Sequence, residues 1–105
     1  MKKVKARFTN WLRLRISEKV WSDEAWDDYL YWQAQDKKIL RRINTLIKDI
    51  ERNGPLTGIG DPEALKGDFQ GYFSRRINAK DRLVYKIENG SRLFIAQCRG
   101  HYDDK

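Results

Sequence analysis

One segment near the middle of this 105-residue chain constrains the fold more than any other. Apolar residues recur there at the intervals of a single helical face over about three turns. They are Ile39, Leu40, Ile43, Leu46, Ile47 and Ile50. Asp36 is suited to cap the start of this helix, and Asn53-Gly54 before Pro55 is suited to end it. A stripe of this kind is buried against another element, so we assign it to the core and give it no chemistry.

A second helix is predicted immediately before the first. Ser22 is a suitable N-cap, and Asp23 and Glu24 follow in the first turn, where the helix dipole favours negative charge. Its apolar face consists of Trp26, Tyr29 and Leu30. The preceding segment Ile16–Trp21 alternates apolar and polar residues and predicts an opening strand. Two consecutive helices with a short link predict an antiparallel helical hairpin.

The C-terminal half contains three strand-like runs. They cover residues 72–78, 82–88 and 92–98. Asn89-Gly90 between the last two predicts a hairpin with a two-residue turn. That turn pairs Glu88 with Ser91, and the resulting register fixes which side chains share a face. The face expected to pack on the helices holds Leu83, Tyr85, Ile87, Phe94, Ala96 and Cys98.

The open face of the predicted sheet is rich in cations. Phe73 and Ile77 point toward the helices in the first of the three strands, which sends Arg76 to the open face. The open face then holds Arg76, Arg82, Arg99 and His101. Arg75 falls on the packed side, which a cation tolerates near a sheet edge by extending its charged head to water.

The elements together predict an α+β fold, in which a two-helix hairpin packs on an antiparallel β-sheet. Between the helices and the strands, residues 55–61 are interpreted as a loop. Residues 62–69 are ambiguous between a helical turn and a loop.

The charge distribution favours a polyanionic partner. The chain carries 22 Lys and Arg against 15 Asp and Glu, a net charge of +7. The excess lies in residues 1–20 and 63–102, whereas residues 21–62 are slightly acidic. Two basic regions in a small domain are typical of nucleic-acid binding, although a basic surface can also serve solubility alone.

Composition excludes several classes of protein. Hydrophobic residues make up 40% of the chain and aromatic residues 12%, which is too much for a disordered chain. No apolar run approaches the roughly 18 residues of a membrane-spanning helix. Cys98 is the single cysteine, so an intrachain disulfide is excluded, and together with the single His101 it cannot complete a zinc site. We expect a small, reduced, cytoplasmic domain.

The N-terminal residues form a basic arm. Phe8, Trp11 and Leu12 are spaced as in a short basic amphipathic helix, which could lie on RNA or on a membrane surface. A frayed or disordered terminus is the simpler interpretation, because isolated helices this short are marginal in water. We therefore expect an arm at residues 1–15, a single domain at 16–102 and a short acidic tail at 103–105.

Several motifs together resemble one known family. The first half contributes Trp21-Ser22, the run from Ala25 to Gln33, Asp36-Lys37-Lys38, Arg42-Ile43-Asn44 and the run from Leu46 to Ile50. The second half contributes Gly58-Ile59-Gly60, Pro62-Glu63, Leu65-Lys66, the run from Ser74 to Ile77, the run from Arg82 to Tyr85, Cys98-Arg99 and His101-Tyr102. The chain resembles the YoeB (Txe) family of bacterial toxins over about residues 18–102.

This resemblance implies a fold, an activity and partners. The family belongs to the RelE superfamily, whose members have a compact α+β fold. Its members are endoribonucleases that cut mRNA in the A site of the 30S ribosomal subunit without a metal or cofactor. Each is held inactive by an antitoxin of the YefM (Phd/YefM) type, through which alone it reaches operator DNA. The resemblance is also compatible with a homodimer.

The resemblance also assigns roles to individual residues. Glu63 matches the general base, His101 the general acid and Arg82 the arginine that stabilises the transition state. Tyr102 matches a further active-site position. Lys66 and Arg76 match RNA-binding positions, to which the open face adds Arg99. A carboxylate, an imidazolium and a guanidinium are suited to attack by a 2′-hydroxyl, protonation of the leaving oxygen and neutralisation of the extra charge.

Each of these residues also has a simpler interpretation. Glu63 could be an acid at a helix start. Lys66 could be merely solvated, and Tyr102 could be a packing residue. Arg76 and Arg82 could bind phosphate without a catalytic role.

This chain departs from the family at a few positions. Asp103, Asp104 and Lys105 follow the usual His-Tyr end. Gly100 replaces an aromatic residue, which predicts a looser segment before the histidine. Asp81 replaces a histidine or polar residue and could pair with Arg82. Two alternative functions remain: a ribosome- or RNA-binding translation inhibitor that does not cleave, and a gyrase inhibitor like those of the ParE branch.

Overall fold

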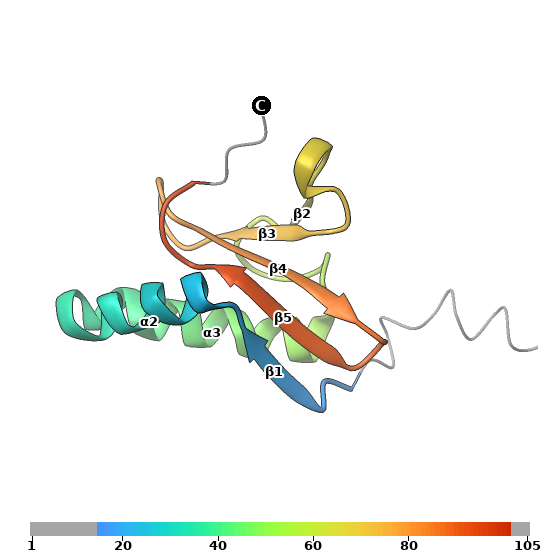
Figure 1. Cartoon of the computed structure of the whole chain (residues 1–105), viewed down its shortest axis with the longest axis horizontal. Helices are drawn as coiled ribbons and strands as arrows, with labels where there is room; N and C mark the ends of the chain where they lie inside the picture. The colour runs from blue at the N-terminus through green and yellow to red at the C-terminus, as the bar shows by residue number, and fades with distance from the viewer. Residues whose placement is uncertain (1–14, 102–105) are drawn as a thin grey trace, which may run out of the picture.

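The computed structural model describes residues 15–101, which form two helices packed on a five-stranded sheet (Figure 1). The helical half consists of β1 (Glu18–Trp21), α2 (Asp23–Gln35) and α3 (Lys37–Asn53). The second half consists of β2 (Glu63–Ala64), the 3₁₀ helix η2 (Gly67–Phe69), β3 (Phe73–Arg76), β4 (Arg82–Glu88) and β5 (Arg92–Gln97). The strand order is β1-β5-β4-β3-β2, with β1 parallel to β5 and the other pairs antiparallel. The predicted α+β class is confirmed.

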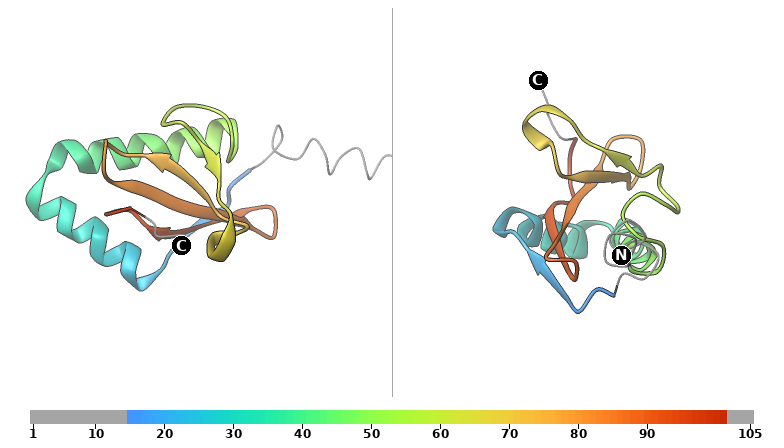
Figure 2. Two further views of the ribbon diagram at one scale, coloured as in Figure 1. Left: turned by 90° about the horizontal axis from the view of Figure 1, so that it is seen from above. Right: turned by 90° about the vertical axis from the view of Figure 1, so that its right-hand side faces the viewer.

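The residues predicted to cap the helices do so. The Ser22 side chain accepts the Ala25 N–H at 2.9 Å, and the Asp36 carboxylate accepts the N–H groups of Lys38 and Ile39. Asp36 also donates its own N–H to the Trp32 carbonyl at 2.8 Å, so one residue ends α2 and starts α3. The two helices therefore diverge from a single link, as Figure 2 shows.

The predicted stripe of α3 lies at the centre of the core. Ile43, Leu46 and Ile50 are fully buried. They share one hydrophobic cluster with Leu83, Tyr85, Leu93, Ile95 and Cys98 of the sheet and its C-terminal extension. Burial of a Leu or Ile side chain contributes about 1.5–3 kcal/mol, so this stripe is a principal source of stability.

The predicted register between β4 and β5 was wrong by one residue. Asn89, Gly90 and Ser91 form a three-residue loop, so Glu88 lies opposite Arg92 rather than Ser91. A slip of one residue moves every side chain of a strand to the other face of the sheet. Leu93 and Ile95 are consequently in the core, and the predicted core residues Phe94 and Ala96 are only half-buried.

A bulge in β5 restores the predicted faces beyond this point. Tyr85 lies opposite Ile95, but the next residue of β4, Val84, lies opposite Gln97, so Ala96 is the extra residue. A bulge of this kind shifts the register by one and changes the direction of the following side chains. Cys98 is therefore buried as predicted, although the register that led to this prediction was wrong.

The ambiguous segment 62–69 contains an edge strand. Glu63 and Ala64 pair with Ser74 and Phe73 of β3, and η2 follows after Lys66. A strand of two residues is too short to show alternation in a sequence.

The described helices include none that is long and apolar enough to cross a bilayer. Most of the predicted arm, residues 1–14, and the predicted tail 103–105 lie outside the described residues.

Candidate functional site

The open face of the sheet is organised in rows that run across the strands. One row, toward the β4–β5 loop, contains Tyr72, Lys86 and Phe94, in which the Lys86 ammonium lies 4.9 Å from the Tyr72 ring centre and 5.5 Å from that of Phe94. The middle row contains Glu63, Ser74, Val84 and Gln97. The last row contains Arg76 opposite Arg82, and the Arg82 N–H continues it to the Gly100 carbonyl at 2.9 Å. Three of the predicted site residues, Glu63, Arg76 and Arg82, therefore stand in the last two rows, whereas Ser74 and Val84 in the middle row are buried.

Glu63 stands at the edge of this face. It is exposed, and its place in β2 is set by pairing with Ser74. It lies two strands and one row away from Arg82, a Cα separation of about 12 Å at ordinary strand spacing.

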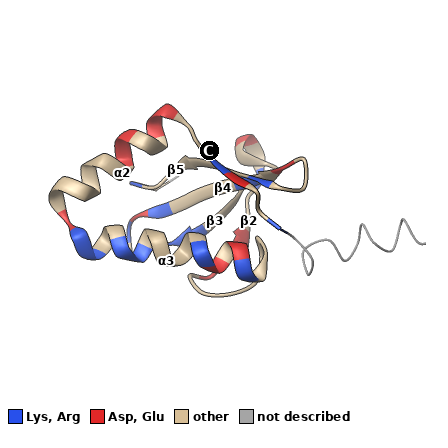
Figure 3. Ribbon diagram, turned by 90° about the horizontal axis from the view of Figure 1, so that it is seen from below, with Lys and Arg blue, Asp and Glu red and all other residues tan. Residues whose placement is uncertain are grey.

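Arg76 and Lys66 bring positive charge to the same region. The Arg76 guanidinium is 54% exposed and lies 3.4 Å from the Asp61 carboxylate, an exposed ion pair that contributes little to stability. The Arg76 carbonyl accepts a hydrogen bond from Arg42 of α3 at 3.0 Å, which holds the end of β3 against that helix. Lys66 is exposed directly before η2. Figure 3 shows the further basic positions along α3 and the acidic ones in the first turns of α2.

Arg82 is more buried than its predicted place on an open face suggests. Its side chain donates through Nη1 to the carbonyls of Asn78 at 3.0 Å, Ala79 at 3.4 Å and Asp81 at 3.2 Å. These carbonyls belong to the turn between β3 and β4, which holds the guanidinium close to the sheet. Arg82 is buried, with 9% of the residue exposed, and its Nη1 is bound to this turn.

His101 is exposed and follows Gly100 directly at the end of the described chain. The Asp81 carboxylate accepts the Gly100 N–H at 2.7 Å and the Asn78 side-chain amide at 3.0 Å. Arg82 donates to the main-chain carbonyl of Asp81, whereas the Asp81 carboxylate accepts from Gly100 and Asn78, so the suggested ion pair between the two side chains does not form. Gly100 is hydrogen-bonded through both its N–H and its carbonyl, contrary to the expectation of a loose segment.

Cys98 is anchored to α2. The Asp28 carboxylate accepts its N–H at 3.0 Å, and the Trp32 indole donates to its carbonyl at 2.8 Å. Burial raises the pKa of Asp28, against the opposing effect of the Cys98 N–H. Burial likewise raises the pKa of the Cys98 thiol, which keeps it protonated and unreactive. The Arg99 side chain contacts α2, with its guanidinium 3.6 Å from the Tyr31 ring centre.

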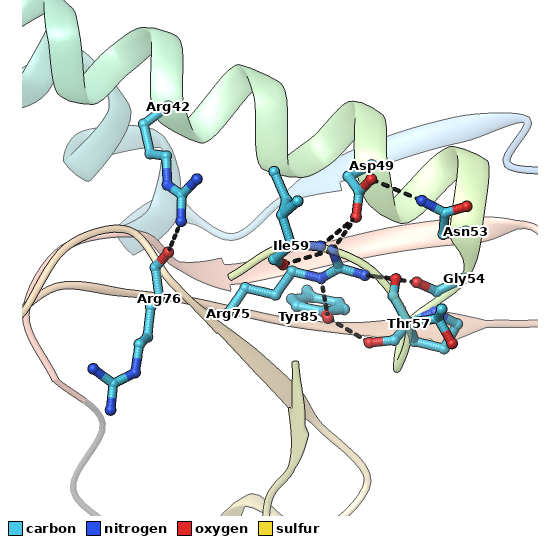
Figure 4. A network of polar contacts seen from close by, with 10 residues as sticks. Arg42, Asp49, Asn53, Gly54, Thr57, Ile59, Arg75, Arg76 and Tyr85 are labelled. Carbon is cyan, nitrogen blue, oxygen red and sulfur yellow. Dashed lines mark hydrogen bonds and ion pairs between the residues drawn. The ribbon is translucent and has the colours of Figure 1, made fainter. Parts of the chain in front are cut away.

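The surroundings of Arg75 differ most from those predicted from the sequence. It lies on the packed side as predicted, but it is fully buried and does not extend to water. Its Nη1 donates to the Asp49 carboxylate and the Ile59 carbonyl, Nη2 to the carbonyls of Gly54 and Thr57, and Nε to the Tyr85 hydroxyl (Figure 4). All five N–H donors of a guanidinium are thereby satisfied.

This network fixes the loop that leads to Glu63. Three carbonyls between residues 54 and 59 converge on one guanidinium, and the Ile59 N–H binds Asp49 at 3.0 Å. Burial acts to raise the pKa of Asp49, but the bonds from Arg75, Ile59 and Asn53 outweigh it and lower that pKa. Burial raises the pKa of Tyr85 to about 12, so its hydroxyl remains a donor to the Pro55 carbonyl. The only signal in the sequence was an arginine at a core position of a strand.

The structure thus gathers some predicted residues and leaves others apart. Arg76, Arg82 and the segment leading to His101 meet at one end of the open face, and Glu63 stands one row away. Tyr102 lies outside the described residues. Among residues 15–101, no group of three or more His, Cys, Asp or Glu side chains is placed to hold a metal ion. A hollow of about 340 Å³ between β1, α2 and α3 contains none of the predicted site residues.

The fold and this cationic face define a class before any relative is considered: a small α+β domain with an acid, a histidine and arginines around one end of its sheet. The family model "YoeB-like toxin of bacterial type II toxin-antitoxin system" matches residues 21–102. The chain belongs to this family of type II toxins.

Individual relatives agree with this assignment. Toxin YoeB of Escherichia coli K12 is 54% identical over 83 residues, which are 79% of this chain and 96% of the relative. A heterotetrameric YoeB–YefM complex from Staphylococcus aureus contains a chain with a TM-score of 0.76 and 48% identity, covering 84% of this chain and 99% of that one. The YoeB/ParE toxin of Agrobacterium tumefaciens gives a TM-score of 0.77 and 48% identity, covering 81% and 99%.

Proposed function

We propose that this toxin is a ribosome-dependent endoribonuclease that cleaves mRNA in the 30S A site and thereby inhibits translation. The observation that carries the proposal is that Arg82 and the segment of His101 meet at one end of the sheet face, with Glu63 one row away at the edge of the sheet. Family membership supports the same activity. The exposed cations Lys66 and Arg76 near this face suit an RNA backbone, and Arg99, whose guanidinium lies over the Tyr31 ring of α2, is the third RNA-binding residue of the proposal.

The reaction assigns one task to each group. The Glu63 carboxylate accepts the proton of a ribose 2′-hydroxyl, and the oxygen attacks the adjacent phosphorus. The bond from phosphorus to the 5′-oxygen breaks, and the His101 imidazolium donates a proton to that leaving oxygen. The products are a 2′,3′-cyclic phosphate and a 5′-hydroxyl. Proton transfer of this kind contributes about 10²–10⁴-fold at each end of the reaction.

Arg82 stabilises the state between substrate and product. The pentacovalent phosphorus carries more negative charge on its oxygens than the starting diester does. Because the turn between β3 and β4 already holds Nη1, the guanidinium is oriented before the substrate arrives. A donor that needs no rearrangement stabilises developing charge most effectively. Arg76, Lys66 and Tyr102 complete the site around the phosphate and the neighbouring nucleotides.

The proposed partners follow from the same face. The S. aureus relative is described in a complex with YefM and also as a dimer. We expect a YefM-like (Phd/YefM-type) antitoxin to cover the cationic face of this chain with acidic and apolar residues. Operator DNA would then be reached only through the antitoxin. Homodimerisation and a cytoplasmic location are part of the same proposal.

End mapping of transcripts on purified ribosomes tests the activity. Wild type should create new 5′-hydroxyl ends within A-site codons, and His101→Ala should reduce their rate of formation by about 10²-fold or more. Glu63→Gln should act similarly. Asp68→Asn, an exposed acid in the nearby η2, serves as the matched control and should cleave normally.

Other outcomes separate the alternatives. Growth arrest without any new RNA ends would support the non-cleaving translation inhibitor. Inhibition of gyrase supercoiling by the purified chain would support the ParE-like alternative. Unchanged cleavage by His101→Ala would remove the general-acid role.

A further inference from the structure

The segment that carries His101 is held at two points by different parts of the molecule. Cys98 is bound through both backbone groups to Asp28 and Trp32 of α2. Gly100 is bound through both backbone groups to the start of β4, by the Asp81 carboxylate and the Arg82 N–H. The residue directly before the histidine therefore has no free backbone group.

Asp81 is itself held firmly. Its side chain is almost fully buried, with 4% of the residue exposed. Its N–H donates to the Asn78 side-chain oxygen at 2.7 Å, and its carbonyl accepts the Ile77 N–H at 2.9 Å. One carboxylate oxygen accepts a hydrogen bond from the Asn78 side-chain amide within the turn, and the other accepts the Gly100 N–H. The bond to Gly100 thus connects the turn between β3 and β4 to the chain end.

The conformation of Gly100 makes this connection important. Its φ of +81° lies in the left-handed region, and nothing lies within 4 Å of where a Cβ would stand. Steric contacts consequently do little to hold this residue. Hydrogen bonds to Asp81 and Arg82 therefore contribute to the direction in which the chain leaves toward His101.

We propose that Asp81 is a positioning residue that aims His101 at the leaving oxygen by binding the Gly100 N–H. This inference rests on the proposed function for its kinetic consequence, but the bond itself can be tested without it. A misplacement of about 1 Å in a catalytic group can reduce the rate about 10²-fold. Loss of the bond should therefore lower kcat and leave KM nearly unchanged, because Asp81 is too buried to contact RNA.

Two substitutions distinguish positioning from a structural role. Asp81→Ala removes both bonds of the carboxylate, whereas Asp81→Asn keeps one side-chain oxygen that can accept the Gly100 N–H. We expect Asp81→Ala to lower kcat about 10–100-fold with KM within about threefold, and Asp81→Asn to recover most of that loss. Asn78→Ala is the control for a general weakening of the turn. It removes the three side-chain bonds of Asn78, which join the Lys80 N–H, the Asp81 N–H and the Asp81 carboxylate, and it leaves the bond between Asp81 and Gly100. It should retain nearly full kcat.

Backbone ¹⁵N NMR of the full-length protein provides a readout that does not depend on cleavage. To limit toxicity, the spectra can be recorded in the Glu63→Gln background. In Asp81→Ala the Gly100 amide signal should move to lower proton frequency, and the amides of residues 99–101 should gain fast motion, while the core signals stay in place. Asp81→Asn and Asn78→Ala should leave residues 99–101 ordered.

The outcomes are separable from those of the proposed function. An unchanged Gly100 signal in Asp81→Ala would overturn the inference, as would a loss of kcat no larger than that of Asn78→Ala. If wild type itself produces no new RNA ends, the proposed nuclease fails, and the NMR comparison still decides whether Asp81 holds the segment of His101.

Discussion

The two ends of the proposed site are supported by opposite kinds of chemistry. The loop before Glu63 folds around a buried cation, because carbonyls of residues 54, 57 and 59 converge on Arg75. The segment before His101 is instead held by two buried carboxylates, Asp28 and Asp81, which accept backbone N–H groups. Irregular backbone needs partners from elsewhere in the fold, and either donors or acceptors can supply them.

The comparison also shows where each end is vulnerable. Three of the five hydrogen bonds that Arg75 makes go to carbonyls of this loop, so a single substitution removes most of its side-chain support. The segment of His101 has its support distributed over α2 and β4, so single substitutions remove only part of it. Substitutions on the two sides should therefore differ in the size of their effects.

The largest effect is expected from Arg75→Met. This change leaves the Asp49 carboxylate without its cation and several buried carbonyls without donors, and breaking a buried ion pair costs about 3–5 kcal/mol. Urea denaturation should show a fall in the free energy of unfolding of that size. Arg76→Met, the same change at the exposed neighbour, should alter stability by no more than about 0.5 kcal/mol. Equal effects of the two substitutions would contradict the role given to the Arg75 network.

A smaller effect is expected from Trp32→Phe on the His101 side. The change removes the indole N–H that binds the buried Cys98 carbonyl, and an unsatisfied buried acceptor costs about 1–3 kcal/mol. Trp26→Phe is the matched control, because Trp26 is 46% exposed. In the same urea denaturation, the loss in free energy of unfolding should be smaller for Trp32→Phe than for Arg75→Met and larger than for the control. A loss as large as that of Arg75→Met would show that support on this side is not distributed.

The smallest effect is a difference in pH dependence between the two sides. The pKa of Asp49 is lower in the folded chain than the unfolded value of 3.8, so its stabilising contribution is complete above pH 3.8 and is lost as the pH falls through the folded pKa. The pKa of Asp28 is raised, so its ionised form disfavours folding and this cost disappears as the pH falls through the folded pKa toward 3.8.

The measurement compares wild type with Asp49→Asn and Asp28→Asn in unfolding experiments from pH 6 to pH 3. As the pH falls, the free energy of unfolding of wild type should decrease relative to that of Asp49→Asn and increase relative to that of Asp28→Asn. Each unit of pKa difference corresponds to about 1.4 kcal/mol. Parallel pH profiles for the two variants would refute the contrast between the two carboxylates.

Much of the fold could be predicted because its signals are local. The caps Ser22 and Asp36 act on N–H groups two or three residues away, and the stripe of α3 is visible at intervals of one helical turn. The sequence pattern also predicts the approximate extents of the three C-terminal strands and the position of the hairpin loop at Asn89-Gly90. The alternation of the strands placed Arg76, Arg82, Arg99 and His101 on one face, the resemblance supplied their roles and added Glu63, Lys66 and Tyr102, and the structure adds the supports of the described residues.

The remaining features depend on contacts between distant parts of the chain. A loop longer by one residue and a bulge at Ala96 reversed the faces of β5 and then restored them, and neither leaves a mark in a pattern of alternation. The side-chain partners of Arg75 and Asp81 lie between 3 and 26 residues away in the sequence. The bond from Arg75 to Asp49 and the bond from Gly100 to Asp81, which support the two ends of the site, join residues 26 and 19 positions apart.

The amino-acid sequence by itself therefore determined the helices, the strands other than β2, the core stripe and the concentration of cations, because these follow from side chains a few residues apart. Only the tertiary structure decided which β5 residues face the core, where the Arg75 charge is buried and which group holds Gly100. Those outcomes depend on satisfying buried polar groups across the fold, and a buried group can be satisfied only by a partner that folding brings within hydrogen-bond distance.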